Sequence, residues 1–251
     1  MSPFSKCCRS SWRVQACFSR RHSSLITELM ENMDKRSLWD RFYTESSSKT
    51  FQNFEWFFGF DSVRDFIMPL LQSSARPDSP VRVLDMGCGT SALGPSIYRS
   101  SPFSVHVTCA DISAVAVRLM QEKTALKAVQ PNNPSSLLRF EELDCTQLDR
   151  RYGPNSLDVI VDKGTTDALL RSREGRGKAS LMLQQCLKAL HSSGSLLQFS
   201  DEDPDARLLW LESAARHHGL KGADVGVQEV GQLRGVYYFC YQVTPLAAAK
   251  C

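Results

Sequence analysis

Carboxylates at the ends of apolar runs are the residues best placed to do chemistry in this sequence. Asp85, Asp111, Asp144 and Asp162 each follow a run of strand-forming residues. Ligands of open α/β sheets bind beyond the carboxyl ends of the strands, so these four side chains are expected to share one edge. Asp111 is placed to accept both hydroxyls of a ribose, and Asp144 the exocyclic amine of an adenine. The backbone NH of Cys145 would then reach a ring nitrogen of the same base.

A glycine turn follows the first of these runs. Gly87 and Gly89 let the backbone approach a ligand closely and turn tightly into the next helix. A dinucleotide enzyme uses a G-x-G-x-x-G turn whose helix N-terminus holds a pyrophosphate, but the third glycine is absent here. Asp85, just before the turn, would repel a pyrophosphate and favour a cation, such as the amino group of a methionine moiety. The pattern therefore favours S-adenosylmethionine over a dinucleotide.

Several segments carry a resemblance to a known family. LDMGCGTSALG, CADIS and LDCTQL are similar to the signature of class I S-adenosylmethionine-dependent methyltransferases, over residues 81–243. DKGTTDAL, which begins at Asp162, and the aromatic segments around Trp39 and Trp56 resemble the methyltransferase-like protein-lysine methyltransferases. Together with LLQFSDEDPDARL, they are similar to the members of that group that act on mitochondrial citrate synthase. The resemblance implies transfer of up to three methyl groups from S-adenosylmethionine to one lysine of citrate synthase.

Further cofactor contacts are implied by the same resemblance. Ile112, next to Asp111, and the aromatic side chains of Trp39 and Trp56 would contact S-adenosylmethionine. The alternative for the two tryptophans is core packing of a helix laid across the sheet.

Asp162 and an acidic cluster are the groups expected to face the substrate. Asp162 would orient the lysine amine as the catalytic residue; the alternative is that it only caps the turn that follows. Asp201, Glu202 and Asp203 follow the fifth predicted strand, so they would share a rim with Asp162 and attract a cationic lysine. The alternative for this cluster is a solvated face. Lys163 is expected to be structural or ion-paired.

Alternating strands and helices are expected to position these residues. Strands are predicted near residues 81–85, 105–111, 137–143, 157–161, 195–199, 225–230 and 236–243. Helices are predicted near residues 61–72, 91–99, 114–129, 178–190 and 206–218, the third with Val115, Leu119 and Leu126 inward. The alternation predicts an α/β fold: a Rossmann-like, doubly wound, mostly parallel seven-stranded sheet. An antiparallel edge hairpin and a helical N-terminal lid would complete it.

The first residues have the composition of a targeting segment. Residues 1–24 are rich in Arg and Ser and hold no Asp or Glu, which is typical of a mitochondrial transit peptide. The alternative is a disordered basic tail. Residues 25–80 are interpreted as the helical lid and linker, and residues 81–245 as the methyltransferase domain. A mitochondrial matrix location follows, and a reducing matrix suits cysteines in apolar segments.

Charge and composition narrow the function classes. The net charge is +3, but the five cations before the first acid, Glu28, leave −2 for the rest of the chain. Nucleic-acid binding, which needs a clustered cationic face, is therefore not expected. Neither a membrane span nor a zinc site is expected, since no apolar run is long enough and no CxxC pair occurs. Two functions stay open: a small-molecule methyltransferase of the quinone-precursor type, and a non-catalytic Rossmann-like protein that binds a nucleotide or a partner.

Overall fold

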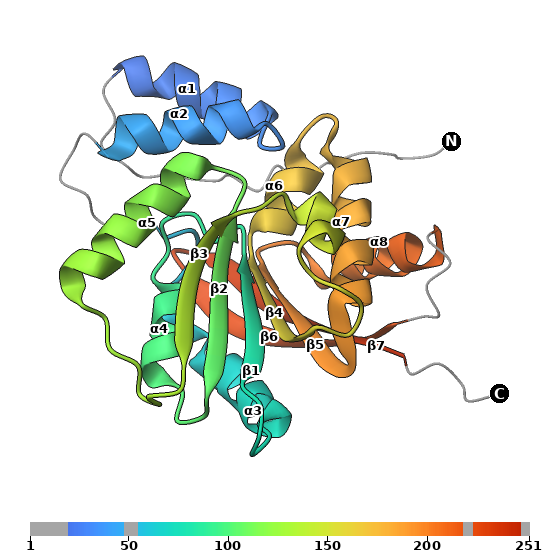
Figure 1. Cartoon of the computed structure of the whole chain (residues 1–251). Helices are drawn as coiled ribbons and strands as arrows, with labels where there is room; N and C mark the ends of the chain where they lie inside the picture. The colour runs from blue at the N-terminus through green and yellow to red at the C-terminus, as the bar shows by residue number, and fades with distance from the viewer. Residues whose placement is uncertain (1–19, 48–54, 218–222, 247–251) are drawn as a thin grey trace.

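A seven-stranded sheet forms the centre of the molecule (Figure 1). The computed structural model describes residues 20–47, 55–217 and 223–246. The strands are β1 (Val81–Met86), β2 (Val105–Asp111), β3 (Leu137–Glu142), β4 (Leu157–Lys163), β5 (Leu190–Ser200), β6 (Ala223–Leu233) and β7 (Val236–Pro245). Their order is β3-β2-β1-β4-β5-β7-β6. Strands β1 to β5 pair in parallel, and β7 is antiparallel to both β5 and β6. The predicted fold class, edge hairpin included, is confirmed.

Apolar side chains of the strands are divided between two cores, one on each face of the sheet. In β1, Val81 and Val83 join the core that contains α3 and α4, while Leu84 and Met86 join the core that contains α7 and α8. Successive side chains of a strand point to opposite faces, which explains this division. All seven residues of β4 are buried, as expected for a central parallel strand covered on both sides.

Helices cover both faces and the carboxyl edge of the sheet (Figure 1). They are α1 (Arg20–Glu31), α2 (Arg36–Ser47), α3 (Arg64–Ser74), α4 (Leu93–Ser100), α5 (Ala114–Lys127), α6 (Thr165–Arg171), α7 (Gly175–Ala189) and α8 (Pro204–His217). Two 3-10 turns, η1 (Phe60–Ser62) and η2 (Cys145–Arg150), lie between them. The pair α1–α2 packs on α5 and α6 at the carboxyl ends of the strands, so it forms the expected helical lid.

Some elements differ from the expectations. Helix α6 is additional, and α7 begins at Gly175, before the predicted start near residue 178. The side chain of Leu126 is 88% exposed rather than inward, because the buried stripe of α5 runs through Ala116, Val117 and Met120 instead. The same stripe leaves Val115 and Leu119 half-buried against the lid.

Some sequence expectations fall outside the described structure. Residues 1–19, most of the proposed transit peptide, lie outside the described residues, and α1 begins at Arg20. Within the described residues, no helix is both long and apolar enough to cross a membrane. The described residues also contain no group of three or more His, Cys, Asp or Glu placed to hold a metal ion.

Candidate active site

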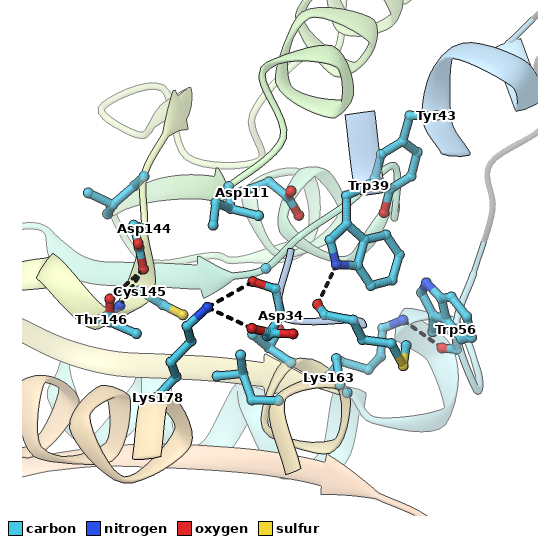
Figure 2. A pocket seen from close by; sticks show the side chains of 18 residues that line it. Asp34, Trp39, Tyr43, Trp56, Asp111, Asp144, Cys145, Thr146, Lys163 and Lys178 are labelled. Carbon is cyan, nitrogen blue, oxygen red and sulfur yellow. Dashed lines mark hydrogen bonds and ion pairs between the residues drawn. The ribbon is translucent and has the colours of Figure 1, made fainter. Parts of the chain in front are cut away.

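A pocket opens beyond the carboxyl ends of the central strands, under the lid (Figure 2). Its empty volume is about 810 Å³ when the solvent-open mouth is counted. Its walls come from the ends of β1, β2, β3 and β4, from α6, and from the lid. The chain reverses the direction of its winding between β1 and β4, so the pocket lies at the topological switch point of the sheet.

The glycine turn after β1 forms the floor of the pocket. Gly87 has a φ of +63° and Gly89 a φ of +52°, in the left-handed region that favours glycine. A Cβ atom on Gly87 would lie 2.0 Å from the Thr165 Oγ1, and one on Gly89 would lie 2.4 Å from the Tyr43 hydroxyl oxygen. The turn therefore has no room for a side chain at either glycine, because Thr165 and Tyr43 pack directly against its backbone.

Asp111 presents its carboxylate to the pocket from the end of β2. Its Oδ2 accepts the backbone NH of Gly89 and its Oδ1 that of Ser113, each at 2.8 Å. An ionised carboxylate has about four acceptor positions, so further lone pairs remain for a ribose. Burial raises the pKa of Asp111 to about 6, although the two backbone hydrogen bonds oppose that rise. Ile112 lines the pocket beside it.

Asp144 and Cys145, which follow the end of β3, also line the pocket. The Asp144 Oδ1 accepts the NH of Thr146 at 2.9 Å and its hydroxyl at 2.7 Å, which caps η2 and fixes the carboxylate. Burial raises the pKa of the Cys145 thiol, so the thiol stays protonated. The structure thus brings these two residues and Asp111, which the sequence predicted to bind the adenosine part of a cofactor, into the lining of one pocket.

Aromatic side chains of the lid close the pocket. Trp39 stacks on Tyr43 with ring centroids 5.9 Å apart and meets Trp56 edge-on at 6.0 Å. The Trp39 Nε1 donates to the Met33 carbonyl at 2.7 Å, which fixes the indole (Figure 2). Both tryptophans thus contact the ligand pocket and also pack against each other.

An ion pair ties the lid to the opposite wall. The Lys178 Nζ of α7 contacts the Asp34 Oδ2 at 2.7 Å and donates to the Asp34 carbonyl at 3.2 Å (Figure 2). The NH of Asp34 also donates to the Ser172 Oγ at 2.8 Å. Burial opposes ionisation of Asp34, but Lys178 and Lys35 outweigh burial and lower its pKa. This ion pair was not identified from the sequence.

Glu55 and Lys163 join the lid to the glycine turn. The Glu55 carboxylate accepts the Ala92 NH at 2.6 Å and the Ser91 hydroxyl at 2.8 Å, at the start of α4. The Lys163 Nζ contacts the Glu55 Oε2 at 3.1 Å and donates to the Trp56 carbonyl at 2.7 Å. The expectation that Lys163 is ion-paired is therefore confirmed. Glu55 was not singled out from the sequence, although its position next to Trp56 was a signal.

Asp85 lies behind the glycine turn rather than in the pocket lining. It is 1% exposed, and its Oδ2 accepts the Gly94 NH at 2.9 Å, which holds α4 on the end of β1. Burial raises its pKa to about 7, against the attraction of Lys163. The structure thus gives Asp85 a contact with the protein backbone, whereas the sequence suggested a contact with a methionine amino group.

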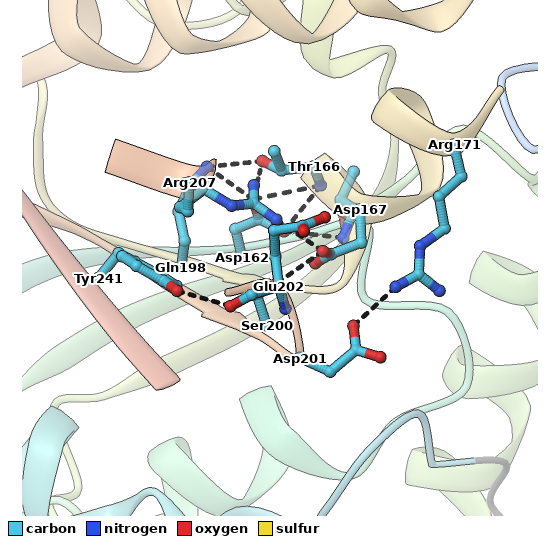
Figure 3. A network of polar contacts seen from close by, with 11 residues as sticks. Asp162, Thr166, Asp167, Arg171, Gln198, Ser200, Asp201, Glu202, Arg207 and Tyr241 are labelled. Carbon is cyan, nitrogen blue, oxygen red and sulfur yellow. Dashed lines mark hydrogen bonds and ion pairs between the residues drawn. The ribbon is translucent and has the colours of Figure 1, made fainter. Parts of the chain in front are cut away.

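Asp162 lies beneath the pocket wall. Its Oδ1 accepts the NH groups of Thr165 at 2.8 Å and Thr166 at 3.2 Å, and its Oδ2 accepts from Gln198 at 3.1 Å (Figure 3). It is 1% exposed, and burial raises its pKa to about 6. The carboxylate therefore faces the first residues of α6, which matches the capping alternative more closely than direct contact with a substrate.

The acidic cluster follows β5, next to Asp162 along the sheet but outside the pocket lining (Figure 3). Asp201 forms an ion pair with Arg171 at 2.8 Å, and burial raises the pKa of Asp201. The Glu202 carbonyl accepts the hydroxyl of Tyr241 at 2.7 Å, while Asp203 is exposed. The cluster is thus partly neutralised, and Asp203 is its most open member.

Comparison with known proteins agrees with this geometry. The methyltransferase-domain family matches residues 77–232. The mitochondrial citrate synthase-lysine N-methyltransferase of Danio rerio is 61% identical over 89% of this chain and 88% of the relative. The Homo sapiens protein of the same name is 42% identical over 83% of this chain and 85% of the relative. Among solved structures, magnesium protoporphyrin IX methyltransferase of Synechocystis PCC 6803 has a similar fold, with a TM-score of 0.55 at 16% identity. That likeness covers 83% of this chain and 94% of the solved chain.

The fold and the pocket define a class I methyltransferase, an enzyme whose methyl donor is S-adenosylmethionine. The expected cofactor is thereby confirmed. The high identity over nearly the whole chain narrows the class to enzymes that modify proteins on lysine. The chain belongs to the family of mitochondrial citrate synthase-lysine N-methyltransferases.

Proposed function

We propose that the protein transfers methyl groups from S-adenosylmethionine to a lysine of citrate synthase, up to trimethyllysine, in the mitochondrial matrix. The observation that carries the proposal is a methyltransferase pocket in a chain 61% identical to an enzyme named for that reaction. Residues 1–24 serve as the transit peptide, residues 25–80 as the lid and linker, and residues 81–245 as the catalytic domain. A net charge of −2 after the leader supports a protein substrate rather than a nucleic acid.

The residues of the pocket divide between the parts of the cofactor. Asp111 accepts the ribose hydroxyls, while Asp144 and the NH of Cys145 bind the adenine, with Ile112 packed beside it. Gly87 and Gly89 lie beside the methionine part, at a turn whose positive φ angles and close contacts with Thr165 and Tyr43 require glycine. Trp39 and Trp56 cover the ligand from the lid.

Methyl transfer requires the protein mainly to align the reacting groups, and not to form a covalent intermediate. S-adenosylmethionine supplies a methyl group already activated on a sulfonium. The lysine ammonium, with a pKa of about 10.4, must lose its proton to water before it attacks. Transfer of the lysine from water into the mostly apolar pocket favours the neutral amine, because burial lowers the pKa of a lysine. Alignment of amine, methyl carbon and sulfur then supplies most of the rate gain.

An acidic rim attracts the cationic target. Asp201, Glu202 and Asp203 lie at the end of β5, beside the strand end that carries Asp162. Negative charge at this edge draws a lysine on a folded partner towards the pocket and disfavours acidic small molecules. Asp203 contributes most, because it is exposed, whereas Asp201 is paired with Arg171.

The test is methylation of purified citrate synthase by the full-length protein, followed by intact mass spectrometry. We expect mass increments of one, two and three methyl groups on a single lysine. Asp111→Asn serves as the cofactor-site control, and it should lose both activity and S-adenosylmethionine affinity. Label from tritiated S-adenosylmethionine that reaches another mitochondrial protein, or a small molecule, while citrate synthase stays unmodified would overturn the proposed substrate.

A further inference from the structure

Thr165 contributes a side chain with a hydroxyl to the lining of the pocket. It is the first residue of α6, separated from the end of β4 only by Gly164, and it lines the pocket. Its Oγ1 lies against Gly87, where an added Cβ would approach to 2.0 Å. Because Gly87 borders the methionine part of the ligand in the proposed function, the hydroxyl lies beside the reacting end of the pocket.

The Thr165 hydroxyl is fixed as an acceptor. Its Oγ1 donates to the Met86 carbonyl at 3.0 Å, and that carbonyl can only accept, so the hydroxyl proton is used. The Thr165 NH donates to the Asp162 Oδ1 at 2.8 Å, which holds the backbone in place. Asp162 is itself held by Gln198 at 3.1 Å. The lone pairs of the hydroxyl thus remain available to a donor in the pocket.

Other acceptors around the pocket are already engaged. The carboxylate of Asp34 is neutralised by Lys178 at 2.7 Å, and the Trp56 carbonyl accepts from Lys163 at 2.7 Å. The Tyr43 hydroxyl shares a hydrogen bond with Trp56, whose indole can only donate. Asp111, Asp144 and the hydroxyl of Thr146, which donates to Asp144, belong to the adenosine end. Among the described side chains of the lining, Thr165 is therefore the acceptor best placed for a target amine.

We infer that the Thr165 hydroxyl oxygen accepts a hydrogen bond from an N–H group of the target lysine. This hydrogen bond turns the amine so that the lone pair of its nitrogen points at the methyl carbon. The inference rests on the proposed function. The lysine nitrogen forms the new N–C bond while the C–S bond breaks, and that electron pair stays on sulfur as the thioether of S-adenosylhomocysteine. The proton lost before attack goes to water. Asp162 acts through Thr165 as a positioning residue.

The number of N–H bonds gives the inference a distinctive signature. A neutral lysine amine has two N–H bonds, monomethyllysine has one, and dimethyllysine has none. Thr165 therefore orients the nucleophile in the first and second transfers. In the third transfer the amine has no N–H group left to donate a hydrogen bond to Thr165. A role that was merely structural would affect all three transfers alike.

The test compares Thr165→Val and Thr165→Ala, which both lack the hydroxyl, with Thr165→Ser, which keeps it. Thr166→Val is the matched control, because Thr166 also bonds to Asp162 but does not line the pocket. Intact mass spectrometry of citrate synthase over time yields a rate constant for each of the three transfers. Loss of one neutral hydrogen bond should slow the first two transfers by about three- to tenfold, with the third within twofold of wild type. Thr165→Ser should recover the wild-type pattern.

A binding assay separates this inference from the choice of protein substrate. Sinefungin carries an amine in place of the methylsulfonium, so wild type should prefer it to S-adenosylhomocysteine more than Thr165→Val and Thr165→Ala do. Calorimetry measures both affinities, and Thr166→Val should retain the preference. Equal slowing of all three transfers, or an unchanged preference for sinefungin in both Thr165 variants, would overturn the role of Thr165. Inactivity of wild type on citrate synthase would overturn the proposed function, and the sinefungin result would still decide the role of Thr165.

Discussion

Gly87→Ala should damage both the stability of the protein and its cofactor site. A non-glycine residue in the left-handed region costs roughly 1–2 kcal/mol, and Gly87 has a φ of +63°. The new Cβ would lie 2.0 Å from the Thr165 Oγ1, so β1 and α6 must move apart, at an overpacking cost of about 1–3 kcal/mol. The sum is a loss of about 2–5 kcal/mol in the free energy of unfolding, measurable by urea denaturation.

Two further variants separate the causes of that loss. Gly177→Ala is the control, because Gly177 lies in α7 with nothing within 4 Å of its added Cβ, and it should gain about 0.5–1 kcal/mol. Adding Thr165→Ala to Gly87→Ala should recover most of the steric part, since only the Cβ of residue 165 then remains at 3.0 Å, and leave the backbone part. Calorimetry should show weaker S-adenosylmethionine binding by Gly87→Ala. The reasoning fails if Gly87→Ala unfolds within 0.5 kcal/mol of wild type and binds the cofactor equally well.

The remaining predictions concern charges around the pocket and the leader. Because ionised Asp111 is the ribose acceptor and its pKa is about 6, S-adenosylmethionine affinity should fall about tenfold from pH 7 to pH 5. Calorimetry on Asp111→Asn should show weak binding with little of that pH dependence. Lys178→Met should speed release of S-adenosylhomocysteine in stopped-flow assays. Because the pKa of Asp34 is lowered in the folded protein, wild type should lose stability when Asp34 is protonated as pH falls below about 4. Lys178→Met should lose less stability over the same pH range. Neutralising residues 201–203 should raise the KM for citrate synthase, more at low salt, and an unchanged KM would mean a solvated face. Residues 1–24 should carry a fluorescent reporter into mitochondria, and a cytosolic reporter would contradict the leader.

The position of the pocket could be predicted from the sequence because it depends on strand ends. Parallel strands end at a common edge, so apolar runs that each end in aspartate indicate which residues lie together. Asp111 and Asp144 therefore reach the pocket as expected, and the glycine turn lies between them and α6. These features depend on local patterns repeated along the chain.

The direction of each strand-end side chain could not be predicted in the same way. Asp85 and Asp162 lie one residue before the ends of their strands, yet each carboxylate turns to a backbone NH of the helix that follows, at Gly94 and Thr165. That choice depends on the three-dimensional course of the turn, which residue spacing does not reveal. The pairing of Asp34 with Lys178 joins residues 144 positions apart, and no local pattern connects them.

The strand order has a consequence for how the chain reaches its folded state inside an organelle. Strand β7, the last in sequence, lies between β5 and β6, so β5 lacks its second neighbour until residues 236–245 are present. A chain that enters a compartment N-terminus first would carry an unpaired, apolar strand edge during almost all of its passage. Such an edge is a template for aggregation, so we expect the incoming chain to depend on chaperones until its final strand arrives. Truncation within β7 should therefore yield insoluble protein, although every residue of the pocket precedes that strand.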